Sequence, residues 1–200
     1  SGFPGMNLEI IGLNLGVYEF RALNISNGDY NNRATVSIID CFSNKVDFNT
    51  NYYNARILNN TTTKIQFRHG LVVNNTTEYV LLLNETQDNL ETEIKNKILN
   101  NDVLYMIGVY NNDYGFVIAN NIMRDISIKK WNANVNVVNK IFNNNFKSDS
   151  TINISHIEVP YYNLVFTNNL FVDTFYFASA TCGLGNSGAA SYSHSSLSND

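Results

Sequence analysis

The segment LLLNETQDNLETEIKNKILNNDVLYMIGVYNNDYGFVIANN, residues 81–121, carries the strongest structural pattern in the chain. Its first half places Leu90, Ile94 and Ile98 four residues apart, on one face of a helix. Asn84 stands where an N-cap is expected, and two glutamates precede lysines in the favourable i,i+4 order. These features predict one packed α-helix around residues 85–100.

The second half of the segment has a strand pattern. Residues 103–110 are apolar at both parities, as in a strand that is covered on both faces. Residues 111–115 supply Asn, Asp and Gly for a turn, and residues 116–119 are apolar again. We therefore expect a β-hairpin here, with the helix lying on its sheet.

Short alternating runs, separated by Asn-rich turns, cover most of the remaining chain. The clearest run places Ile65, Phe67, Leu71 and Val73 on one parity, which His69 shares. About ten such strands with one helix predict a mainly β fold, a β-barrel or β-sandwich with one packed α-helix, which is α+β by strict count. We find no internal repeat in this pattern.

The composition divides the chain into three parts. Residues 1–5, SGFPG, precede Met6 and are interpreted as a cloning remnant. Residues 6–180 are long enough for a single β-rich domain with one core. Residues 181–200 are a tail rich in Gly, Ser and Ala, which is either flexible or ordered only against a partner subunit.

The charge and cysteine content exclude several classes of protein. Charged residues make up 15% of the chain, the net charge is −4 and the sequence pI is about 5.3, so nucleic-acid binding is not expected. No apolar run is long enough for a membrane span. Cys41 and Cys182 form neither a metal motif nor a disulfide framework, and we favour two buried free thiols over a single bridge.

Two glycine-rich patterns near the end of the chain are candidate catalytic motifs. Residues 183–188 fit G-x-G-x-x-G, but too few residues follow for a dinucleotide-binding βαβ unit. Residues 185–188, GNSG, resemble the nucleophile signature of chymotrypsin-like serine proteases, which would make Ser187 the nucleophile and His69 its base. That resemblance covers four residues, and His69 lies on a core parity. The three histidines are too isolated for a metal site, so we expect no enzyme, catalytic residue, cofactor or metal.

Aromatic side chains near the expected loop edges are the best candidates for binding. Exposed tyrosines among Asn, Ser and Gly are typical of adaptable contact surfaces. The candidate binding surface consists of Tyr52, Tyr53, Trp131, Tyr161 and Tyr162.

The Asn, Tyr and Phe bias, the β-rich pattern and the Gly/Ser-rich end resemble bacteriophage or virion structural proteins, such as tail, baseplate or fibre components. The resemblance implies a non-enzymatic assembly protein located in the virion or outside the cell. Its partners would be its own copies, as a homo-oligomer and most simply a trimer, and other structural proteins. A carbohydrate- or receptor-binding adhesin-like module is the alternative, with a surface glycan as partner, and a serine hydrolase using Ser187 is a third.

Overall fold

The computed structural model places most of the 200-residue chain in β-strands. The residues that it describes are 7–21, 34–49, 53–83, 96–110, 115–130, 139–147, 149–157, 164–172 and 175–182. No helix occurs in this described part of the chain.

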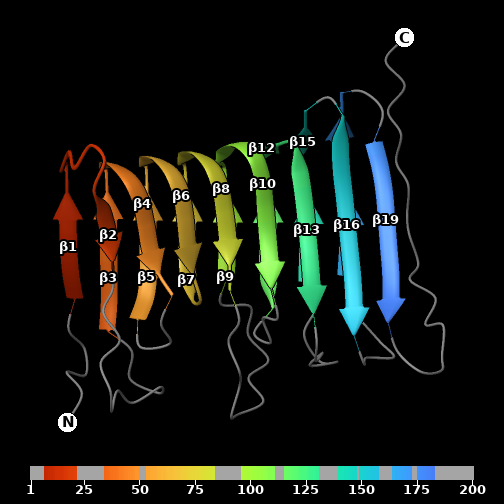
Figure 1. Ribbon diagram of the computed structural model, residues 1–200, viewed down its shortest axis with the longest axis horizontal. Coiled ribbons are helices and arrows are strands. Elements are labelled where there is room, and N and C mark those ends of the chain that lie inside the picture. Colours follow the sequence, from red (N-terminus) through yellow and green to blue (C-terminus); the bar gives the residue numbers. More distant parts are fainter. Residues whose placement is uncertain are drawn as a thin grey trace.

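The strands form two parallel sheets (Figure 1). The first sheet has eight strands, in the order β1 (Asn7–Ile11), β3 (Ala34–Ile39), β5 (Tyr53–Leu58), β7 (Gly70–Val73), β9 (Asn96–Leu99), β11 (Phe116–Ala119), β14 (Asn139–Phe142) and β17 (Leu164–Thr167). The second sheet has eleven strands, and its continuous strands are β2 (Glu19–Arg21), β4 (Phe42–Phe48), β6 (Thr61–Phe67), β8 (Thr76–Leu82) and β10 (Asp102–Tyr110). Its remaining strands form two-part runs: β12 (Ile122–Met123) with β13 (Asp125–Lys130), β15 (Asn145–Phe146) with β16 (Ser150–Ile157), and β18 (Leu170–Phe171) with β19 (Phe175–Cys182).

The chain winds as a solenoid. Each coil runs along the first sheet, turns a tight two-residue corner, runs along the second sheet and returns by a connection of variable length. Figure 1 shows the coils succeeding one another along the long axis, from β1 at one end to β19 at the other. Every strand therefore pairs with the equivalent strands of the neighbouring coils, which is the arrangement of a parallel β-solenoid.

The expected barrel or sandwich with one packed helix is therefore wrong. The end of the expected helix, residues 96–99, is the strand β9, while residues 84–95 lie outside the described part. The expected hairpin is also wrong, because β10 pairs in parallel with β8, β12 and β13, and β11 pairs in parallel with β9 and β14. The two strands of that segment belong to different sheets.

The tight corners share one backbone conformation. The first residue of each corner has a positive φ of 51–68°, a region that Asn, Asp and Gly adopt more readily than other residues. These residues are Gly12, Asp40, Asn59, Asn74, Asn100, Asn120, Asn143 and Asn168. The amide of each of the first seven donates to a carbonyl in the next coil, as Asn59 does to Val73 at 3.0 Å. The Asn-rich turns of the sequence are thus the repeated corners of a solenoid.

The second corner residue points inward and forms a ladder of buried asparagines. Its members are Asn60, Asn75, Asn101, Asn121, Asn144 and Asn169, none of which is more than 6% exposed. In a typical step, Asn101 Oδ1 accepts hydrogen bonds from Asn75 N at 2.9 Å and from Asn75 Nδ2 at 3.0 Å. Asn101 Nδ2 in turn donates to Val72 O and to Asn121 Oδ1. Each inner amide therefore uses both of its hydrogens and both acceptor positions of its oxygen.

The ladder ends at Cys41, which occupies the asparagine position one coil earlier. Cys41 N donates to Asn60 Oδ1 at 2.8 Å, as each asparagine amide does further along. The buried Cys41 thiol is free and contacts Ile39 O at 3.2 Å. The Leu13 amide meets the Cys41 sulfur at 3.4 Å, so sulfur replaces the amide oxygen at this step.

Two stacks of apolar side chains run parallel to the ladder and fill the interior. Strand register stacks these residues directly on one another, which buries almost all of their surface and supplies the hydrophobic stabilisation. In the first sheet the stack is Ile38, Ile57, Val72, Ile98, Ile118 and Ile141. In the second sheet it is Val46, Ile65, Val80, Ile107, Ile126 and Ile152.

The corner at Arg68 and His69 changes the parity of the chain. Ile65, Phe67 and His69 are buried as the alternation predicts, but Val72, rather than Leu71 or Val73, is the next fully buried residue. Gly70 has a φ of 136°, and a Cβ there would collide with the backbone oxygen of Ala55 and lie 2.7 Å from its nitrogen. The close approach of two coils therefore requires glycine at this position.

We expect Asn101→Ala to lower the free energy of unfolding by about 3–5 kcal/mol, because the buried Asn75 amide loses its acceptor and Val72 O and Asn121 Oδ1 each lose a side-chain donor. The matched control is Asn100→Gly, which changes the exposed corner residue while permitting its positive φ, and should cost under about 0.5 kcal/mol. Urea denaturation followed by circular dichroism measures both variants. Equal stability of the two would contradict a ladder that supports the fold.

Gly70→Ala should destabilise the protein by more than about 3 kcal/mol, since backbone atoms of Ala55 cannot move aside as a side chain can. Gly12→Ala is the control, because its φ is also positive but a Cβ there meets nothing within 4 Å. It should cost only the left-handed strain, about 1–2 kcal/mol. Thermal denaturation of both variants distinguishes collision from strain.

Candidate functional site

A shallow groove runs over the outer surface of the second sheet, beside the tight corners. Its volume is about 570 Å³, within the usual size range of ligand sites. Four successive coils provide its floor through β4, β6, β8 and β10, and Lys147, just after β15, closes one side.

The asparagine ladder determines which residues line this groove. Phe42, Thr61, Thr76 and Asp102 each follow an inward corner residue directly, so they point outward and stand in register on adjacent coils. Two positions further along each strand, Asn44, Thr63, Glu78 and Leu104 form a second outward row. Both rows therefore run along the solenoid axis.

Some polar groups of the groove are held by neighbours, while others are open to solvent. Thr63 Oγ1 donates to the carbonyl oxygen of Asn44 and contacts Asn44 Oδ1 at 3.0 Å. Lys147 Nζ contacts Asp102 Oδ1 at 3.0 Å. Within the described residues, the side chains of Thr61, Thr76 and Glu78 make no hydrogen bond. The groove thus combines fixed polar pairs with unused hydroxyl and carboxylate groups.

The apolar part of the groove is formed by Phe42 and Leu104. They remain 48% and 47% exposed, whereas apolar residues further along the same strands, such as Val46 and Ile107, are fully buried. An exposed aromatic face beside open hydroxyl groups can take an amphipathic ligand. It is less suited to a purely ionic one.

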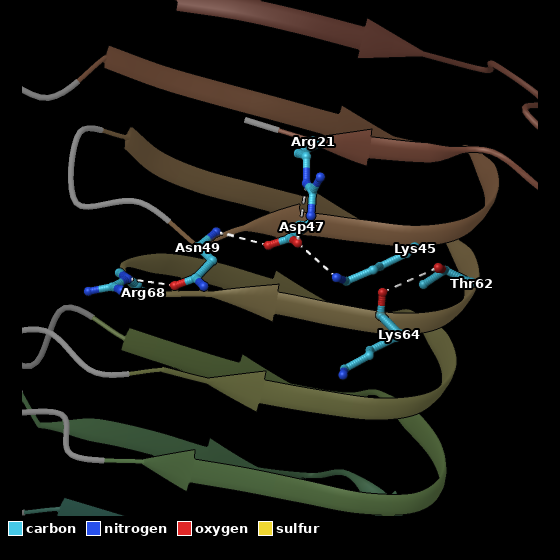
Figure 2. Close-up of polar contacts among 7 residues, drawn as sticks. All are labelled: Arg21, Lys45, Asp47, Asn49, Thr62, Lys64 and Arg68. Atoms are coloured by element: carbon cyan, nitrogen blue, oxygen red, sulfur yellow. Dashed lines mark hydrogen bonds and ion pairs between the residues drawn. The ribbon is translucent and has the colours of Figure 1, made fainter. Parts of the chain in front are cut away.

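A network of charged residues lies next to the groove on the first coils of the second sheet (Figure 2). Asp47 on β4, whose side chain is 9% exposed, contacts Lys45 Nζ at 2.8 Å and Arg21 Nε on β2 at 3.7 Å. Its other oxygen accepts from Asn49 N at 3.2 Å, and Asn49 Oδ1 accepts from Arg68 Nε at 2.7 Å. Figure 2 shows Asp47 between Arg21 and Lys45, so the carboxylate links two coils.

This network is best explained as structural. Lys45 and Lys64 stand in register on adjacent strands, about 4.8 Å apart, where two ammonium groups repel each other. Asp47 offsets that repulsion, and Glu19 stands in register with Lys45 on the other side. Asp47 therefore holds Lys45 and Arg21 in place across two coils.

The described residues contain no cluster of potential metal ligands. No membrane-crossing helix occurs among them either.

Of the five aromatic residues expected to form a binding surface, the structure describes the backbone of Tyr53 alone. Tyr53 begins β5, and Tyr52, Trp131, Tyr161 and Tyr162 lie outside the described residues, as does Ser187. The connections that contain them follow β4, β13 and β16, and each leads back to the first sheet. The flanking strand ends lie at the same edge of the solenoid, opposite the tight corners (Figure 1). The aromatic surface stays a prediction.

The sequence pattern did not lead us to the groove residues, although a short repeated motif marks them. Residues 59–63 read NNTTT and residues 74–78 read NNTTE, and further Asn-Asn pairs begin the corners at 100, 120, 143 and 168. This repeat is hidden because successive ladder asparagines are 15, 26, 20, 23 and 25 residues apart. The expectation of no internal repeat is therefore wrong.

No protein-family model, curated protein or solved structure matches the chain.

We expect Asp47→Ala to cost about 1–2 kcal/mol, because Lys45, Arg21 and the Asn49 amide lose a mostly buried acceptor. Asp102→Ala is the control, since its ion pair with Lys147 is exposed and should contribute under about 0.5 kcal/mol. Equilibrium unfolding at low and at high salt measures both. A larger loss for Asp102→Ala would contradict the structural role of Asp47.

Proposed function

We propose that the protein is a non-enzymatic structural and assembly module, of the kind found in virion tails, baseplates or fibres, and that it acts through protein–protein contacts. The observation that supports this proposal is an apolar row on the outside of the first sheet. Its members stand in register on six successive coils: Ile39, Leu58, Val73, Leu99, Ala119 and Phe142.

An outward row on a solvated sheet is normally polar, because alternation directs apolar residues to the core. Here the row stays apolar for about 24 Å, at about 4.8 Å a coil. All its members except Ala119 are partly exposed, and Ile11 extends the row with 61% of its surface exposed. A continuous apolar stripe of this kind marks a surface for another protein.

The neighbouring outward row favours copies of the same chain packed side by side. Arg56, Lys97 and Lys140 are exposed in that row and alternate with Leu71 and Val117. In a parallel homotrimer the apolar rows would meet at the threefold axis, with equal coils at equal heights. The cations would then lie beside the contact and remain solvated.

A double variant, Leu58→Gln with Leu99→Gln, should dissociate the oligomer while leaving the thermal midpoint of the monomer nearly unchanged, since both side chains point away from the core. Size-exclusion chromatography with light scattering gives the mass. Ile122→Gln is the control, because Ile122 is an exposed apolar residue on the other sheet. A wild-type protein that stays monomeric at high concentration would contradict the proposal.

A further inference from the structure

The groove on the second sheet has no part in the assembly contact, because it lies on the other sheet of the solenoid from the apolar row. We propose that it binds a neutral, hydroxyl-rich glycan chain lying along the solenoid axis. This binding activity goes beyond the assembly function and does not depend on the oligomeric state.

The chemistry of the groove favours a glycan over other ligands. Sugar rings present apolar C–H faces and hydroxyl edges, which match Phe42 and Leu104 on one hand and Thr61 and Thr76 on the other. Glu78 can accept hydrogen bonds from two hydroxyl groups through its unpaired carboxylate. A lipid chain would leave these polar groups without partners, at a cost in free energy.

The charge of the groove favours a neutral glycan. Glu78 and Asp102 carry two negative charges and Lys147 carries one positive charge, which leaves the groove at −1. Lys147 is already paired with Asp102 at 3.0 Å. A polymer of carboxylates, sulfates or phosphates would therefore be repelled by Glu78 and would find no unpaired cation in the groove.

The geometry of the groove suits a polymer. Thr61, Thr76 and Asp102 repeat one outward position at successive coils, so a chain along the axis meets hydrogen-bonding groups at each step. The backbone beneath them is fixed by Asn60, Asn75 and Asn101. Little ordering of the protein is needed on binding, which improves the affinity that shallow contacts provide.

The test is a microarray of neutral, N-acetylated, sialylated and sulfated oligosaccharides probed with the full chain, followed by calorimetric titration of the best neutral hit. We expect binding to neutral members. Phe42→Ala should weaken it about tenfold or more, and the near-isosteric Thr76→Val about fivefold. Leu170→Ala is the control, since Leu170 is an exposed residue further along the same sheet and outside the groove. It should bind like the wild type.

Circular dichroism melting of each variant tests whether the fold is retained. Light scattering measures the oligomeric state separately. No binding at millimolar glycan, binding only to anionic glycans, or equal affinity in all variants would overturn the proposal. Shortening of the bound oligosaccharide would also overturn it, because Glu78 and Asp102 would then be acting as a catalytic pair.

Discussion

The structure depends on the hydrogen bonds between buried asparagine side chains at the tight corner of successive coils. A primary amide has two donors and two acceptor positions, and here each is used by the coil before or after it. An apolar residue at this position would leave the backbone amide of the equivalent asparagine in the preceding coil without an acceptor, as for Asn75 N at Asn101. The ladder thus satisfies backbone groups that a two-residue corner cannot pair by itself.

The ladder also fixes which residues face inward. Because side chains alternate along a strand, the inward corner residue sets the parity of the residues directly after it, so Thr62 and Thr77 face inward like Asn60 and Asn75. The threonine row of the groove follows from that position, whereas Ile65 and Val80 in the second stack face inward because the register is interrupted in between, at Thr63 and Glu78. A slip of one residue in a single coil would place isoleucines in water and threonines in the core.

Much of the β character was predictable from the sequence, because alternation over short runs is a local property. The prediction of a helix was wrong, because a spacing of four residues fits both one face of a helix and one parity of a strand. Ile98, which was assigned to the helix, lies in the strand β9. The prediction of a hairpin was wrong for a related reason. Two apolar runs joined by a turn can also be the last strand of one coil and the first strand of the next. Pairing in this fold joins residues 15 to 28 positions apart, which no local pattern specifies. The groove could not be found for the same reason, because Thr61, Thr76 and Asp102 become neighbours only once the register is known.

The two kinds of corner have different tolerance for change, and this separates structure from function in the molecule. At the tight corner, adding or removing a residue would break the ladder, and two residues separate the strands at every such corner from β3–β4 to β17–β18. At the opposite corner, the connection is two residues between β6 and β7 and thirteen between β8 and β9, and the ladder is unaffected. Length and sequence can therefore vary there at little cost in stability. Side chains that serve binding can accumulate in these connections and on the outer rows, while the asparagines keep the coils in register.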